Sequence, residues 1–284
     1  MTLRERLERG PIVTAPGAPD ALTARLIGHM GFEAVYMTGL GATASRLGMP
    51  DLGLMSQSEM AEHARAMTRA AGIPVIADAD TGYGGPLNIR RAVADYAMAG
   101  VAALHLEDQV SPKRCGQLSG VRLVEVPEAE ARLRAALAAR DAFAAEMLVI
   151  GRTDALPALG IEAAVERARR YAGLGVDLVF VDGIKTRAEV EAVAERVPGR
   201  KVVSLVDGTD AAGLTREELG EMGFSLCLYA VTTLFAALGA ARRALESLNA
   251  TGSVAGIGGQ MTYAEFCEVV GLGAHQGFAH EFEA

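Results

Sequence analysis

Short apolar segments rich in Val, Ile and Leu recur along the chain, separated by longer segments with a different pattern. Apolar runs of this length, bounded by turn-forming residues and rich in β-branched side chains, predict buried strands. We identify eight of them, at residues 11–15, 33–37, 74–80, 102–108, 147–154, 177–182, 201–206 and 225–230.

The segments between the predicted strands have helical spacing. Residues 58–72 ("SEMAEHARAMTRAAG") and 161–175 ("IEAAVERARRYAGLG") repeat apolar positions every three to four residues, and each ends at a glycine suited to a helix C-cap. Strands that alternate with helices and are apolar along most of their length predict a parallel sheet covered on its outer face. Eight such units predict a (β/α)8 TIM-type barrel.

The alternative fold is a doubly wound open sheet with a small second domain. No GxGxxG follows the first predicted strand, so the barrel is favoured. The domain prediction is a catalytic barrel over residues 1–250 and a C-terminal linker with a helical extension over 251–284. Because "TGSVAGIGGQMTYAEFCEVVGLG" offers no further strand, we expect its helix to cap the barrel or to pack on a neighbouring subunit.

The 284 residues carry a net charge of −8, which disfavours nucleic acid as a partner and favours a small molecule. No apolar stretch is long enough to span a membrane, and "MTLRERLERG" is too charged for a secretory signal. The three cysteines form no CxxC pair, so we expect reduced thiols in a cytoplasmic protein.

Acidic side chains follow the third and fourth predicted strands. Asp78 and Asp80 are two residues apart and share one side of their strand, and Glu107 and Asp108 end the next strand. Carboxylates that converge on one barrel mouth repel each other unless a hard cation neutralises them, which predicts Mg2+, with Mn2+ as the other option. Each acid alone also fits a salt bridge or a helix cap. Asp51 in "MPDLG" either orients a metal-bound water or begins the next helical region.

Two further features predict anion binding at the same mouth. Arg152 in "GRTDA" is either a bidentate partner for a substrate carboxylate or the partner of Asp154 in an ion pair. The loop after the second strand, "YMTGLGATASRLGMPDLG", could offer backbone N–H groups to a second anionic group. These groups belong to Thr38, Gly39, Leu40 and Gly41.

The segment "PKRCGQ" places Cys115 between two cations and a glycine. Lys113 and Arg114 should favour its thiolate, whereas Cys227 and Cys267 have the apolar surroundings of core filler. None of the five histidines recurs at ligand spacing, so metal binding through imidazole is not expected.

Four segments together carry a family resemblance. "VYMTGLGATASRLGMPDLG", "ADADTGYGG", "LHLEDQVSPKRCGQ" and "IGRTDA", in this order, resemble the isocitrate lyase and phosphoenolpyruvate mutase superfamily, in particular its 2-methylisocitrate lyase-like branch. The resemblance covers nearly the whole chain, and "KRCG" after "LEDQ" is its most specific element. It implies a (β/α)8 barrel, a homotetramer with an exchanged terminal helix, and Mg2+-dependent chemistry next to a 2-oxo acid enolate.

The resemblance also implies roles for residues. Asp78 matches the direct metal ligand, and the acids that hold metal-bound waters are matched by Asp80, Glu107 and Asp51. The substrate carboxylate and oxyanion site is matched by Tyr36, Thr38, Gly39 and Leu40. Arg152 matches the arginine that clamps the 2-oxo acid, and the mobile catalytic loop is matched by Lys113 and Cys115. Gly116 would let this loop close over the site. In lyases of the family this cysteine protonates the leaving carbanion.

Three positions depart from the family pattern in the part that should contact the rest of the substrate. Gln117 stands where the lyases usually have His, Asp182 where Glu is common, and "SLVDGTDAAGL" lacks the "NxTE" pattern. A dicarboxylate such as a 2-alkylmalate or dimethylmalate is therefore favoured over a tricarboxylate such as 2-methylisocitrate. The predicted function is a retro-aldol carbon–carbon lyase that releases a 2-oxo acid such as pyruvate. Alternatives are an oxaloacetate decarboxylase, a phosphonopyruvate-type mutase or hydrolase, and a silent 2-oxo acid sensor.

Overall fold

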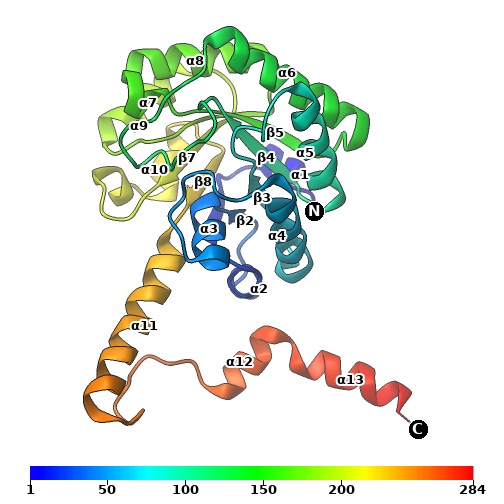
Figure 1. Ribbon diagram of the computed structural model, residues 1–284, viewed down its shortest axis with the longest axis vertical. Helices are drawn as coiled ribbons and strands as arrows, with labels where there is room; N and C mark the ends of the chain where they lie inside the picture. Colours follow the sequence, from blue (N-terminus) through cyan, green and yellow to red (C-terminus); the bar gives the residue numbers. More distant parts are fainter. Residues whose placement is uncertain (284) are drawn as a thin grey trace. The chain divides into compact units, whose positions relative to one another are not determined.

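Eight parallel strands close into a barrel in chain order (Figure 1). The structure is a computed structural model that describes residues 1–283. The strands are β1 Val13–Ala18, β2 Val35–Met37, β3 Val75–Asp78, β4 Ala103–Glu107, β5 Leu148–Thr153, β6 Leu178–Val181, β7 Lys201–Leu205 and β8 Leu226–Tyr229. The predicted fold class is confirmed, and each of the eight predicted segments contains or overlaps one strand.

Helices cover the outside of the barrel, as the alternating pattern predicted (Figure 1). They are α2 Ala21–His29, α3 Gly39–Leu47, α4 Gln57–Ala71, α5 Pro86–Met98, α6 Val126–Phe143, α7 Ala155–Leu159, α8 Ile161–Gly173, α9 Arg187–Arg196, the 3-10 turn η1 Asp210–Gly213, and α10 Arg216–Glu221. The first helix, α1 Leu3–Arg9, differs, because its Leu3 and Leu7 pack with residues inside the barrel. Local signals set their ends. Ser56 and Glu59 form a capping box at the start of α4, and Gly72 ends that helix with a left-handed φ of 66°.

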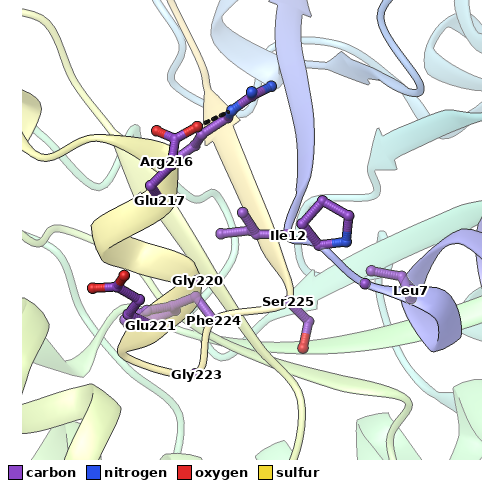
Figure 2. Close-up of a pocket in the computed structure, with 11 residues that line it drawn as sticks. Leu7, Ile12, Arg216, Glu217, Gly220, Glu221, Gly223, Phe224 and Ser225 are labelled. Atoms are coloured by element: carbon purple, nitrogen blue, oxygen red, sulfur yellow. Dashed lines mark hydrogen bonds and ion pairs between the residues drawn. The ribbon is translucent and has the colours of Figure 1, made fainter.

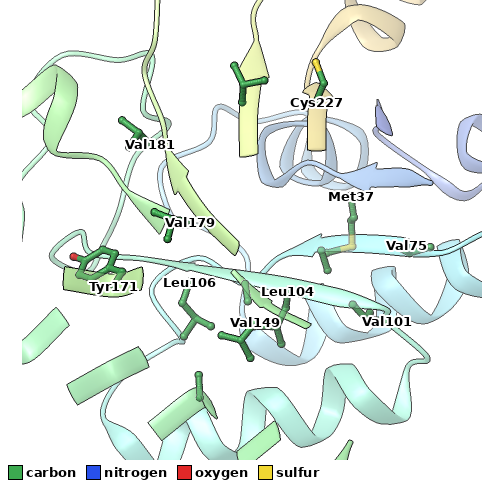
Figure 3. Packing of buried hydrophobic residues seen from close by; sticks show 14 of the residues in the cluster. Met37, Val75, Val101, Leu104, Leu106, Val149, Tyr171, Val179, Val181 and Cys227 are labelled. Atoms are coloured by element: carbon green, nitrogen blue, oxygen red, sulfur yellow. The ribbon is translucent and has the colours of Figure 1, made fainter. Parts of the chain in front are cut away.

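Side chains alternate between two apolar layers along each strand. Val149 and Val179 pack in the layer between strands and helices (Figure 3). Ile150 and Phe180 belong to the layer inside the barrel. The same alternation continues at the strand ends. A polar residue there that lies two positions after an inner-layer residue therefore points into the barrel mouth.

The chain divides into two compact units, Met1–Thr232 and Thr233–Ala284. The sequence placed this boundary at residue 250, which is near the end of α11 Thr232–Thr251 rather than at its start. The second unit also contains α12 Tyr263–Val270 and α13 Leu272–Phe282, and it exposes large apolar side chains such as Phe235 and Phe278. Helix exchange within a tetramer stays a prediction. Among the described residues, no helix is long and apolar enough to cross a membrane.

Candidate active site

The inward-facing residues at the C-terminal ends of β3 to β6 meet at one mouth. Strand register sets Asp78 beside His105 and Glu107 beside Arg152. Asp182 follows β6 in phase with the inward-facing Phe180. Each of these five side chains is buried, so the mouth concentrates charge in surroundings that exclude most water.

The Lys113 ammonium lies among the predicted metal-binding acids. Its Nζ is 2.8 Å from Asp51 Oδ1 and 2.8 Å from Asp80 Oδ1. The backbone N–H of Asp80 donates to Asp78 Oδ1 at 2.9 Å, which ties two of the acids together. Burial, with Asp78 and Asp51 close by, raises the pKa of Asp80 to about 6 even though Lys113 opposes the shift. Lys113 therefore does not fully offset the burial of Asp80 and the negative charge beside it.

Glu107 is the acid that the protein leaves least satisfied. Neither of its carboxylate oxygens has a hydrogen-bond partner in the described structure, and its nearest cation is Arg152, with Nη2 3.3 Å from Oε2. Burial raises the pKa of Glu107 well above its ordinary value, with Asp154 and Asp78 adding to the shift and Arg152 opposing it. A buried carboxylate with free lone pairs is typical of a site that receives a cation or a proton.

Four acids are the predicted metal ligands: Asp78, Asp80, Glu107 and Asp51. Each offers carboxylate oxygens, which suit a hard divalent cation. Their present arrangement differs from a closed coordination sphere. Within residues 1–283 no group of three such side chains converges as a metal cage does. The Lys113 ammonium lies between Asp51 and Asp80 instead.

Arg152 is held by carboxylates on three sides. Its Nε and Nη2 donate to Asp154 at 3.1 and 2.7 Å, and Nη2 also donates to Asp182. The ion pair with Asp154, one of the two sequence interpretations of Arg152, is therefore present. Arg152 also faces the mouth, because its Nη1 is 4.0 Å from Asp78 Oδ2. The guanidinium is fixed in place where a substrate carboxylate could approach it.

The expectation that Asp108 joins the acids at the mouth is wrong. Asp108 comes one residue after the inward-facing Glu107, and the alternation turns its side chain to the outside of the barrel. There its carboxylate accepts hydrogen bonds from Thr153 Oγ1 and Tyr171 at 2.7 Å each and from Arg167 at 3.1 Å. Asp108 therefore joins strand β5 to helix α8, and it has no direct part in the mouth.

The N-terminus of α3 opens onto the same acids. Thr38 is its N-cap, no side chain caps the helix there, and the Gly39 N–H donates to Asp78 Oδ2 at 3.2 Å. A Cβ at position 39 would lie 2.5 Å from Asp78 Oδ2, so only glycine permits this approach. Free N–H groups at a helix N-terminus attract anions, which agrees with the predicted oxyanion site of Thr38, Gly39 and Leu40.

Tyr36 has a buried partner that the sequence did not identify. Its hydroxyl lies 2.9 Å from His105 Nε2, and both side chains are buried inside the barrel. His105 Nδ1 in turn is 3.7 Å from Asp78 Oδ1. Burial lowers the pKa of His105 to about 4, so the imidazole is neutral at physiological pH. The period-two pattern of β4, which sets His105 in phase with Glu107, was the signal for this position.

The loop that carries Cys115 is folded over the mouth. The Cys115 N–H donates to the carbonyl of Asp51 at 3.1 Å. Gly116 lies against the carboxylates that hold Arg152, because an added Cβ would be 2.4 Å from Asp182 Oδ2 and 2.7 Å from Asp154 Oδ1. The half-buried Gln117 follows directly. The predicted loop residues and the predicted strand-end residues are therefore brought together.

The expected effect of the neighbouring cations on Cys115 is wrong. Lys113 turns to Asp51 and Asp80, and Arg114 donates to the carbonyl of Ser119 at 2.9 Å. Burial raises the pKa of Cys115 to about 11, and Asp182 and Asp51 add to this shift, although the Gln117 N–H opposes it. Cys115 is thus a protonated thiol at neutral pH, which suits a proton donor better than a base.

A separate pocket lies at the opposite end of the barrel, before strands β1 and β8 (Figure 2). Its lining includes Leu7, Ile12 and Phe224, and its charged pair, Arg216 with Glu217, is already formed at 2.6 Å. None of the predicted site residues lines this pocket. Active sites of TIM-type barrels lie at the C-terminal ends of the strands, so the acid-rich mouth remains the candidate.

Known proteins are similar to this chain over nearly its whole length. A family described as phosphoenolpyruvate phosphomutase matches residues 3–249. The chain is 39% identical to 2,3-dimethylmalate lyase of Eubacterium barkeri over 271 residues, which cover 95% of this chain and 93% of that one.

Two solved structures are also similar to this chain. One of oxaloacetate acetylhydrolase with 3,3-difluorooxalacetate matches with a TM-score of 0.92 and 37% identity, over 99% of this chain and 95% of that one. One of phosphonopyruvate hydrolase with oxalate and Mg2+ matches with a TM-score of 0.88 and 30% identity, over 99% of each chain.

Proposed function

Because the chain belongs to the phosphoenolpyruvate mutase and isocitrate lyase superfamily, we propose that it is a Mg2+-dependent carbon–carbon lyase. Its substrate would be a 2-hydroxy dicarboxylate of the 2,3-dimethylmalate or 2-alkylmalate type. Retro-aldol cleavage would release a 2-oxo acid such as pyruvate and a second carboxylate. The observation that carries the proposal is the protonated Cys115 thiol on a loop that closes over the acids and Arg152.

The metal belongs to this proposal. Asp78 would hold Mg2+ directly, with Asp51, Asp80 and Glu107 around it, because all four are buried carboxyl groups and neither oxygen of Glu107 has a hydrogen-bond partner in the described structure. The bound cation would stabilise negative charge that develops on the substrate oxygens. The complex of phosphonopyruvate hydrolase with oxalate and Mg2+ supports this assignment by similarity.

The chain's own residues would bind and orient the 2-oxo acid half of the substrate. Arg152 would bind its carboxylate, and the free N–H groups at the start of α3 would face its other oxygens. Tyr36 would contact the reacting hydroxyl, with His105 holding the phenol in place at 2.9 Å. Each of these groups is fixed before substrate binds, which favours a reactive geometry.

Cys115 would complete the reaction. As the carbon–carbon bond breaks and the hydroxyl becomes the 2-oxo group, the hydroxyl proton would pass to Tyr36 and from it to the neutral His105. The electron pair of the broken bond stays on the carbon that carries the second carboxylate, and the Cys115 thiol donates a proton to that carbon. In the reverse direction the thiolate would remove the same proton. A thiol with its pKa raised to about 11 keeps its proton until the carbanion forms.

The remaining part of the site favours a small substrate arm. Asp154 and Asp182 hold Nε and Nη2 of Arg152 and lie against Gly116, so carboxyl groups line the space beneath the loop, whereas Nη1 of Arg152 faces Asp78. A third substrate carboxylate would be repelled there. This argues for a dicarboxylate over a tricarboxylate such as 2-methylisocitrate.

A substrate panel tests the proposal. The purified protein with Mg2+ is offered 2,3-dimethylmalate, 2-alkylmalates, 2-methylisocitrate, isocitrate, oxaloacetate and phosphonopyruvate, and products are identified by mass spectrometry with an EDTA control. We expect EDTA-sensitive formation of a 2-oxo acid and a second carboxylate from an alkylmalate. Consumption of oxaloacetate or phosphonopyruvate alone would overturn the lyase assignment.

A further inference from the structure

The loop between β4 and α6 is closed at its base by backbone pairing. Gln109 and Leu123 form an antiparallel bridge, the Val110 N–H donates to the Arg122 carbonyl at 2.8 Å, and the Val124 N–H donates to the Asp108 carbonyl at 2.9 Å. The segment from 110 to 122 is therefore a compact loop whose two ends are fixed to each other. Pairing at the base does not by itself determine where the tip of such a loop lies.

The Gln109 side chain supplies a second attachment inside this loop. Its Nε2 donates to the carbonyl of Arg114 at 2.8 Å, and its Oε1 accepts from the N–H of the same residue at 3.1 Å. The side-chain amide thus pairs with both backbone groups of one residue, as a neighbouring β-strand would. We call these two hydrogen bonds the Gln109 clamp.

The clamp is itself held rigidly. Gln109 is only 1% exposed, and Arg132 on α6 donates to its carbonyl at 2.9 Å. A buried amide whose donor and acceptor are both used cannot give up either bond without leaving a polar group unpaired. The residue after the clamped Arg114 is Cys115.

We propose that Gln109 is a positioning residue that sets the Cys115 thiol over the barrel mouth through its clamp on the Arg114 backbone. The proposal rests on the lyase function for its kinetic part and on the loop geometry alone for its structural part. Gln109 lies two residues beyond Glu107 and does not itself reach the acids, because its side-chain amide is used by Arg114. Its effect on the reaction is therefore confined to the placement of the loop.

Two substitutions remove the clamp in steps. Gln109→Glu keeps an acceptor for the Arg114 N–H but replaces the donor to the Arg114 carbonyl with an oxygen, and Gln109→Met keeps the side-chain length while removing both bonds. The matched control is Gln57→Met, which removes one partly buried hydrogen bond, from Gln57 Nε2 to Asp95 at 2.8 Å, outside the loop. Melting temperatures show whether each variant is folded.

The structural readout is alkylation by iodoacetamide, followed for each cysteine peptide by mass spectrometry. We expect Gln109→Met to raise the alkylation rate of Cys115 about tenfold, which corresponds to about 1.4 kcal/mol, with Gln109→Glu in between. Cys267 in the second unit is the internal reference and should not change. An unchanged Cys115 rate, or a parallel rise at Cys115 and Cys267, would overturn the clamp.

The kinetic readout separates placement from binding. We expect kcat for hydroxy-acid cleavage to fall about tenfold in Gln109→Met while KM changes less, because the 2-oxo acid site is untouched. A rise in KM with kcat unchanged would overturn the positioning role. If the unsubstituted protein cleaves no hydroxy acid, the lyase proposal fails, and the alkylation comparison alone decides the clamp.

Discussion

Lys113 and Asp51 form a buried ion pair, with Nζ 2.8 Å from Oδ1 and both side chains about 5% exposed or less. The pair joins the catalytic loop to the segment that follows α3, across 62 positions of sequence. The same ammonium contacts Asp80, so a single cation supports two acids of the proposed metal site.

Replacing Lys113 should show how strongly Asp51 and Asp80 need a positive charge beside them. Lys113→Met would leave Asp51 and Asp80 buried without a partner, and we expect the free energy of unfolding to fall by about 3 kcal/mol in urea denaturation. Mg2+ should then stabilise the variant more than the unsubstituted protein, because it supplies the missing positive charge. The control is Lys185→Met at an exposed position, which should change neither quantity. Equal stabilisation of the two proteins by Mg2+ would argue against the acids as its ligands.

Cys115 should be required for turnover and dispensable for metal binding. A serine hydroxyl is a much weaker acid than a thiol, so Cys115→Ser should lower kcat at least a hundredfold. Calorimetric titration should show Mg2+ affinity unchanged, since the sulfur is not among the proposed ligands. Cys267→Ser in the second unit is the control and should retain full turnover. Substantial cleavage by Cys115→Ser would disprove the proton-donor role.

The pH dependence of alkylation tests the protonation state of Cys115. Its pKa is raised to about 11, so the thiolate fraction should increase about tenfold with each pH unit from 8 to 10. A small reference thiol with an ordinary pKa should approach its limiting rate over the same range. The rates follow from iodoacetamide labelling of the folded protein and peptide mass spectrometry. A Cys115 rate that levels off by pH 9 would show that the thiol is more acidic than its burial dictates.

Most of the fold could be predicted from the sequence, because each strand is a short apolar run and each helix carries its own periodicity and end signals. Asp78 and Asp80 both lie near Lys113 at the mouth, but Asp80 follows the end of β3 in a turn with a φ of 46°, so alternation along the strand does not place it as the sequence predicted. In β4, side chains alternate between the inside and the outside of the barrel, so His105 and Glu107 point inside and Asp108, which follows, points outside. This alternation was enough to predict all three positions. The chemistry of Cys115 could not be predicted from its neighbours. Lys113 and Arg114 are adjacent in sequence, but their side chains bind Asp51 and Ser119 instead of the thiol.

Asp108 offers the sharpest test between the sequence prediction and the structure. A metal-site acid would lose Mg2+ affinity on replacement, whereas the structure places Asp108 outside the barrel with Arg167 and Tyr171. In Asp108→Asn the charge that pairs with Arg167 is lost, and the amide cannot satisfy all four groups that now donate to the carboxylate.

We therefore expect Asp108→Asn to lower the free energy of unfolding by about 3 kcal/mol while Mg2+ affinity is kept. Turnover should fall modestly, because the Asp154 N–H, which donates to Asp108 Oδ1 at 2.9 Å, helps to place the partner of Arg152. Asp141→Asn, which breaks an exposed pair with Arg140, is the control and should cost less than about 0.5 kcal/mol. Loss of Mg2+ binding with stability unchanged would return Asp108 to the metal site. Retained Mg2+ binding in a destabilised protein would show that two consecutive residues have different roles: Glu107 points into the mouth, and Asp108 stabilises the fold outside the barrel.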